Sequence, residues 1–458
     1  GSQYKGLRNF LSTNLRLKKF HVDFSGSYLG TDYSRNQSVV LRHKGTLSRD
    51  FNAFTLGVKE EAEKNRWQHL YSTGLLSNSH AFNEYEAFMS RGDSLENHFY
   101  ISYTHRSDQL PKNGSLQEST YSHDVRIDYD WRSHDLHSLN LTMSYRRLNV
   151  SDTSLVRESE KQSILGRMDH QYHTLGRWFS SGSFYELGSG METVKEYFYL
   201  DVGPGQGIYQ WVDYNENQVQ ELDEFEEARF QDQARFIRVS RPTNQLERVL
   251  YHRFNQRFTL QPARVWQNAS GWKKFLSRFS EQMTYKIYQK KRNTGWASVL
   301  LPIANKKDDK KLTHLNYAFR NHLSFRHTRA GLHVDYIFMQ QKHVNMLSNG
   351  FETTANDIDK IKLRWKIFPD IYLLNETAKG NKKNQSEYFE AKNYTLEYFH
   401  ETIGFDYQAG VSLRLNLDYN FKKTLNLSGN EKALEHRVEG QINTPAGKKG
   451  NLNGNLAF

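Results

Sequence analysis

Hydrophobic and polar residues alternate along most of this 458-residue chain. Val125 to Trp131, Leu139 to Tyr145 and Val411 to Phe421 place an apolar residue at every second position. In the longest run, the polar positions between the apolar ones include Arg414, Asn416 and Asp418. Because successive side chains of a strand point to opposite faces, this pattern predicts strands with one apolar and one polar face.

The length of the alternating runs restricts the kinds of β-protein to which the chain can belong. Strands of globular proteins average about 5–6 residues, whereas a tilted strand that crosses a bilayer needs about 9–11. Several runs here reach the longer value, and polar connections such as 107–122 and 151–162 separate them. If each strand and its connection together take about 20–25 residues, the length of the chain predicts on the order of 16 to 22 strands. Asn113-Gly114 and Asn349-Gly350 are the clearest tight hairpin turns.

The fold predicted from this pattern is all-β. We expect a large antiparallel up-and-down meander, closed into a transmembrane β-barrel, in which residues 1–458 form a single domain. Val411, Leu413, Leu415 and Leu417 would meet lipid, and the polar positions between them would line the lumen. Tyr145 and Trp131 would lie in the interfacial aromatic belts. A soluble sheet protein whose apolar faces pack on each other is the alternative.

Composition refines this prediction. The mean hydropathy of −0.81 is low for a membrane protein, but in a barrel only one residue in two faces lipid. No window approaches 18 consecutive apolar residues, so we expect no transmembrane helix. The chain lacks cysteine, which excludes disulfides, cysteine-ligated metals and a thiol nucleophile.

The net charge of +11 raises the question of a nucleic-acid partner. Lysines cluster at 290–292, 306–311 and 382–383, and we expect these clusters in solvated loops. Other cations occur singly within strands and form no stripe. We therefore predict no nucleic-acid binding.

One segment breaks the alternation. Residues 201–244 predict a long loop inserted into the β-domain, and its centre matches an EF-hand calcium loop at most ligand positions. Positions one, three, five, seven and twelve are occupied by Asp213, Asn215, Asn217, Val219 and Glu224. Oxygen ligands at this spacing suit Ca²⁺. Gln218 stands at position six, where glycine normally accommodates a positive φ, so we expect a weakened site.

Two other interpretations of this segment remain open. It is also typical of a solvated acidic turn, and residues 222–231 have the spacing of a short exit helix. Asp223, Glu224 and Glu226 would be the first candidates for the carboxylates of a glycan hydrolase. No phosphate-binding loop, zinc-binding helix or serine nucleophile elbow accompanies them, so we expect no enzymatic activity.

Three stretches resemble a known group of proteins. They are Gly203-Pro-Gly-Gln-Gly-Ile-Tyr-Gln-Trp-Val-Asp-Tyr-Asn with Leu222-Asp-Glu-Phe-Glu, Gln231-Asp-Gln-Ala-Arg-Phe-Ile-Arg-Val, and Val438-Glu-Gly-Gln-Ile-Asn-Thr-Pro-Ala-Gly. They resemble segments of large, poorly characterised outer-membrane and cell-surface β-proteins of Gram-negative bacteria. The resemblance covers about a tenth of the chain, departs from the family at Gln218, and implies an envelope barrel without implying a particular reaction.

The sequence therefore predicts a bacterial outer-membrane β-barrel with surface-exposed loops, acting as a structural or transport component of an envelope assembly. Its expected partners are outer-membrane lipid, lipopolysaccharide and other envelope proteins. A soluble extracellular β-sheet domain that binds glycans is the first alternative, and an envelope hydrolase is the second.

Overall fold

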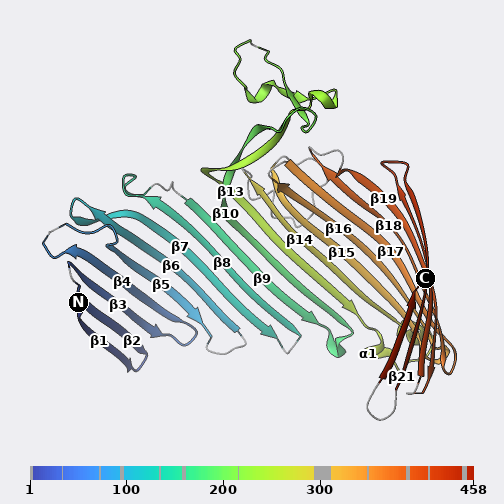
Figure 1. Ribbon diagram of the computed structural model, residues 1–458. Coiled ribbons are helices and arrows are strands. Elements are labelled where there is room, and N and C mark those ends of the chain that lie inside the picture. Colours follow the sequence, from blue (N-terminus) through green and yellow to red (C-terminus); the bar gives the residue numbers. More distant parts are fainter. Residues whose placement is uncertain are drawn as a thin grey trace. The chain divides into compact units, whose positions relative to one another are not determined.

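The computed structural model is dominated by long antiparallel strands (Figure 1). It describes residues 4–33, 35–71, 74–92, 97–133, 136–156, 161–214, 216–292, 311–347, 350–387, 392–410, 413–445 and 451–457. These residues form 22 strands, at the upper end of the predicted range. The prediction of an all-β antiparallel meander is confirmed. No helix in the described part is both long and apolar enough to cross a membrane.

The chain divides into two compact units. The first comprises Gly1–His170 with Glu186–Ser189, and the second comprises Gln171–Tyr185 with Gly190–Phe458. The first unit contains most of β9 (Lys161–His173) and eight earlier strands, which are β1 (Tyr4–Leu17), β2 (Phe20–Tyr33), β3 (Asn36–Asp50), β4 (Thr55–His69), β5 (His80–Arg91), β6 (Asn97–Lys112), β7 (Ser115–Ser133) and β8 (His137–Val150). Each strand from β1 to β7 pairs antiparallel with the next.

Strand β10 (Phe179–Asp201) contributes to both units, and the remaining strands belong to the second. They are β11 (Tyr209–Trp211), β12 (Phe225–Glu227), β13 (Phe236–Leu260), β14 (Phe279–Arg292), β15 (Leu312–His327), β16 (Leu332–Leu347), β17 (Gly350–Phe368), β18 (Ile371–Ser386), β19 (Tyr394–Ala409), β20 (Leu413–Asn426), β21 (Lys432–Pro445) and β22 (Asn451–Ala457). From β13 to β22 each strand again pairs antiparallel with the next.

Among the described residues, helical structure is confined to connections. It comprises η1 (Leu175–Arg177), η2 (Leu222–Glu224), η3 (Gln231–Gln233), α1 (Ala263–Trp266), α2 (Gly271–Leu276) and η4 (Thr328–Ala330). The exit helix expected over residues 222–231 is wrong. The chain makes one 3-10 turn there and enters β12, because Phe225 stacks on Tyr199 of β10 with ring centroids 3.9 Å apart.

The hairpin turn predicted at Asn113-Gly114 is confirmed. Both residues have positive φ values, 52° and 79°, and the flanking Lys112 and Ser115 are paired. Two consecutive positive φ values define a type I′ turn, which matches the twist of the flanking strands. The second predicted turn includes Asn349, which lies outside the described residues.

The lysine clusters expected in loops lie partly in strands instead. Lys290 to Arg292 end β14, and Lys382 and Lys383 belong to β18. Lys290 pairs with Glu192 at 2.7 Å, and Arg292 pairs with Glu247 at 3.3 Å. Because Glu192 and Glu247 are distant in sequence from residues 290–292, the local sequence did not predict that these cations are paired with carboxylates. The cluster at 306–311 lies outside the described residues except for Lys311.

Candidate functional site

The first unit has an apolar face that is open to its surroundings. Cross-strand pairing places Leu47, Val58, Ala87, Tyr103 and Val125 in one continuous row over β3 to β7. Of these, Leu47, Val58 and Tyr103 are about half exposed, at 49%, 53% and 47%. A contiguous apolar surface of this kind is rare on soluble monomers and marks a surface that meets another apolar phase or partner.

The second unit repeats this arrangement. Trp365, Leu373, Phe405 and Leu417 form a row over β17 to β20. Trp365, Phe405 and Leu417 are 44%, 48% and 55% exposed. Leu417 belongs to the predicted lipid-facing run, whereas Val411 of that run lies outside the described residues. Both units therefore expose one apolar face.

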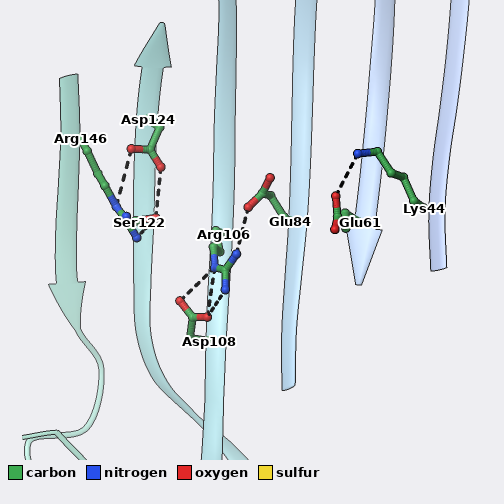
Figure 2. A network of polar contacts seen from close by, with 8 residues as sticks. All are labelled: Lys44, Glu61, Glu84, Arg106, Asp108, Ser122, Asp124 and Arg146. Carbon is green, nitrogen blue, oxygen red and sulfur yellow. Dashed lines mark hydrogen bonds and ion pairs between the residues drawn. The ribbon is translucent and has the colours of Figure 1, made fainter. Parts of the chain in front are cut away.

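The opposite face of the first unit carries paired charges (Figure 2). Lys44 of β3 lies 3.2 Å from Glu61 of β4, and Arg106 of β6 lies 3.3 Å from Glu84 of β5. These residues form a second cross-strand row, offset from the apolar row by an odd number of residues. Because faces alternate along a strand, the charges lie on the other side of the sheet.

The network continues across β6 to β8. Arg106 also contacts Asp108 at 2.9 Å, and Arg146 of β8 contacts Asp124 of β7 at 3.6 Å and Ser122 at 3.4 Å (Figure 2). These side chains keep partial contact with solvent, so each pair contributes about 0.2–1 kcal/mol. The face is thus polar and nearly charge-compensated, as expected of a wet surface.

The second unit also has a polar face. Lys360 and Lys362 of β17 both pair with Glu376 of β18, the latter at 2.7 Å. Arg414, predicted to line a lumen, donates to Asp406 at 3.0 Å, and Asp406 is buried. The cations Lys360, Lys362 and Arg414 are therefore matched by carboxylates of adjoining strands, whereas Asp418, also predicted to line the lumen, lies opposite Glu439.

The predicted calcium loop forms the connection of a small hairpin between β11 and β12. Strand β10 ends at Asp201 and β13 begins at Phe236, and the intervening segment extends beyond the ends of these strands (Figure 1). Aromatic contacts fix its base, since Phe225 lies 5.0 Å from Phe236 and Tyr199 lies 5.1 Å from Tyr209 between ring centroids.

Hydrogen bonds within the loop bring three of the five predicted calcium ligands together. The Asp213 carboxylate accepts the backbone N–H groups of Asn217 and Gln218 at 3.1 and 2.8 Å, and Asn217 Oδ1 accepts the N–H of Val219 at 2.6 Å. Gln218 has the positive φ that position six requires, 58°. These bonds bring Asp213, Asn217 and Val219 together, whereas Asn215 lies outside the described residues.

Glu224 has a different environment. Its side chain is only 3% exposed, and its Oε2 accepts the indole N–H of Trp211 at 2.8 Å. Oε1 is buried without a hydrogen-bond partner in the described part of the chain. The sequence pattern did not predict Trp211 as the hydrogen-bond partner of Glu224. The contact is possible because Trp211 pairs across the hairpin with Phe225, the residue next to Glu224. Across the described ranges, no cluster of three or more His, Cys, Asp or Glu side chains has metal-site geometry.

Of the proposed hydrolase carboxylates, Glu224 and Glu226 are held by other contacts, whereas the side chain of Asp223 lies outside the described part of the structure. Glu226 accepts hydrogen bonds from Gln210 at 2.7 Å and from Tyr214 at 3.0 Å. The Gln210 amide, followed by the Tyr214 hydroxyl, lowers the pKa of Glu226, and Glu226 in turn raises the pKa of Tyr214. A lowered pKa suits an ionised carboxylate and not a general acid.

Comparison with known proteins gives distant structural matches. No protein-family model matches the sequence, and no curated protein matches it. The chain is similar to the siderophore receptor PiuA from Acinetobacter baumannii, with 8% identity over 99% of this chain and 76% of that one and a TM-score of 0.35. It is also similar to the ferric-catecholate import receptor Fiu from E. coli K12, with 8% identity over 99% and 76% and a TM-score of 0.35.

A third match is the alcaligin outer-membrane receptor FauA from Bordetella pertussis. It is 9% identical over 100% of this chain and 73% of that one, with a TM-score of 0.34. At these TM-scores the likeness assigns no function to this chain.

Proposed function

We propose that this protein is a bacterial outer-membrane β-barrel with a structural or transport role in the cell envelope. The main support for this proposal is that both units expose an apolar face and have a face of paired charges on the opposite side of the sheet. A membrane-spanning barrel needs apolar side chains toward lipid and polar side chains toward its lumen. Strands of 14 to 19 residues, as in β6 to β8, are long enough to cross a bilayer when tilted.

The connections support an orientation for the second unit. At one end most are short, as at Thr328–Ala330 between β15 and β16, and the exception is the 261–278 connection between β13 and β14. At the other end, 34 residues separate β10 from β13, interrupted only by short elements. Outer-membrane barrels have short periplasmic turns and longer extracellular loops. We therefore assign the segment 202–235 to the cell surface, where lipopolysaccharide and other envelope proteins would be its neighbours.

Membrane fractionation of the complete protein, expressed with its native export signal, tests the proposal. We expect retention in the outer-membrane fraction and a mobility shift on heating in detergent gels. Release into aqueous buffer without a shift would contradict it and favour the soluble glycan-binding domain. Transport of a solute would be tested separately, by uptake into vesicles that contain the folded protein.

We also propose that the 213–224 loop binds Ca²⁺ and that the ion stiffens the surface segment. The proposal is supported by the Asp213 carboxylate, which accepts two backbone N–H groups, and by the positive φ of Gln218. Calcium titration by calorimetry tests it, with Asp213→Asn expected to abolish binding. Glu226→Asn is the matched control, because it removes a carboxylate of the same hairpin that is not a predicted ligand. Equal calcium binding by all three proteins would contradict the assignment.

A further inference from the structure

The connection between β13 and β14 has an aromatic side. Trp266 of α1 lies 6.3 Å from Trp178 and 5.8 Å from Trp272 between ring centroids. Phe275 of α2, the helix that also contains Trp272, lies 5.3 Å from Phe279 of β14 between ring centroids. Trp272 and Phe275 are 63% and 51% exposed. Their exposure means that these large apolar side chains are left for a neighbouring phase or molecule to cover.

This aromatic cluster adjoins the apolar face of the sheet. Phe279 of β14 pairs with Phe325 of β15, and Phe325 pairs with Val334 of β16. Val334 pairs in turn with Leu363 of β17, two residues from the exposed Trp365. Because cross-strand partners share a face, the aromatic side of the connection extends the surface proposed to meet lipid. Aromatic girdles occupy this position in membrane barrels.

The same connection has a cationic side. A hollow of about 740 Å³ lies among α1, α2 and the ends of β14 and β15, and its lining includes Arg264, Lys274, Arg278 and Arg326. No carboxylate belongs to its described lining. Lys274 and Arg278 follow Trp272 and Phe275 by two or three residues, so cations and exposed aromatic rings alternate along one short segment.

Within the described residues, the side-chain contacts of Arg264, Lys274 and Arg326 involve no carboxylate. Arg264 donates to Gln261 at 2.6 Å, and Lys274 donates to the backbone carbonyl of Gln267. Arg326 donates to a ring nitrogen of His333 at 3.3 Å. All three acceptors are uncharged oxygens or an imidazole nitrogen. This contrasts with the polar faces of both units, where cations are matched by carboxylates.

We propose that this connection binds the phosphate headgroup of an anionic phospholipid, resting on the proposed membrane function. The aromatic side lies in the boundary between headgroups and acyl chains, and the cations of the hollow contact the phosphate. Exposed Trp and Phe beside Lys and Arg are typical of interfacial anchors. Uncompensated cations favour a negative headgroup over a zwitterionic one, because each contributes attraction to anionic lipid.

Tryptophan quenching by brominated lipids tests the proposal. The full-length protein is inserted into phosphatidylcholine vesicles that contain a minor fraction of brominated phosphatidylglycerol or, in parallel, brominated phosphatidylcholine. We expect stronger quenching by the phosphatidylglycerol. Trp272→Phe should reduce this difference, because Trp272 lies beside the hollow.

Charge variants then locate the binding site. Substituting Arg264→Gln, Lys274→Gln and Arg278→Gln together should reduce the lipid preference by at least about tenfold. The matched control removes three cations from the opposite end of the second unit, through Lys382→Gln, Lys383→Gln and Lys432→Gln, and should keep the preference. Equal quenching by both lipids in the unaltered protein would overturn the proposal, as would a preference that survives the first triple substitution.

A gel assay and a phosphate-buffer comparison distinguish failure of the headgroup site from failure of the proposed membrane function. A heat-modifiability gel on every sample reports insertion, so loss of insertion in the unaltered protein refutes the membrane function. Normal insertion without lipid preference refutes only the headgroup site. Binding of inorganic phosphate without discrimination between the two lipids would also overturn the lipid assignment. Selectivity that persists in phosphate buffer matched to chloride in ionic strength supports it.

Discussion

Neighbouring residues on opposite faces of β8 provide a sharp test of the membrane orientation. Met143 lies on the apolar face, pairs with Ile127 and is 46% exposed. Thr142 lies on the other face and pairs with Asp128. We compare Met143→Arg with Thr142→Arg, which place the same charge one residue apart in the same strand.

The expected magnitudes differ widely between the two environments. If the apolar face meets lipid, Arg near the bilayer midplane lowers the free energy of unfolding by about 2–4 kcal/mol. At Thr142 the new cation lies opposite the Asp128 carboxylate, and we expect a change within about 0.5 kcal/mol. In a water-soluble sheet, the half-exposed Met143 would also tolerate Arg, since solvent-facing substitutions usually change stability by about 0.5 kcal/mol or less.

The assay is urea-induced unfolding from lipid vesicles, followed by tryptophan fluorescence and by the heat-dependent gel shift. Folding of both variants should be reversible for the comparison to hold. Small and equal effects of the two substitutions would refute the lipid-facing assignment of this face. A larger cost at Thr142 than at Met143 would reverse it.

The remaining predictions concern connections. Hydrogen bonds from Lys112 and then Ser154 hold the pKa of Asp152 at about 2. The stabilisation from the Lys112–Asp152 contact should therefore be fully present above about pH 4 and lost as the pH falls through about 2, and amide hydrogen exchange in residues 151–156 would detect this loss. Asp152→Asn should abolish the pH dependence. Gly114→Ala should cost about 1 kcal/mol in urea unfolding because φ is 79° there, whereas Gly166→Ala, with open space around the added carbon, should not destabilise the protein. Gln218→Gly should tighten calcium binding in calorimetry by relieving the positive φ of 58°, and unchanged or weaker binding would contradict the calcium proposal.

The sequence predicted the features that depend on local alternation. The faces of β7 and β8 follow directly from the period of two, because Ile127 and Met143 share one side and Asp128 and Thr142 share the other. The Asn113-Gly114 turn was equally accessible, since few residue pairs adopt two positive φ values. These features require only the stereochemistry of neighbouring residues.

Features that depend on distant residues were not predicted. Glu192, the partner of Lys290, is 98 residues away in sequence, so the pair cannot be inferred from the lysine cluster. The exit helix failed for a similar reason, because Phe225 is fixed by Tyr199 from another strand. Helices α1 and α2 contain four and six residues, too few for a helical period to stand out.

The charge pairs of the polar face also bear on how the strands find their alignment during assembly. A slip of two residues between β3 and β4 would keep every side chain on its proper face, so the apolar pattern alone does not penalise it. In one direction that slip would bring Lys44 opposite Lys59, and in the other it would bring Arg42 opposite the uncharged Asn65. The native alignment instead pairs Lys44 with Glu61 and Arg42 with Glu63. Each slip keeps one opposite-charge pair, Arg42 with Glu61 or Lys44 with Glu63, and loses the other, so the two pairs together favour the native strand alignment over its nearest competitors.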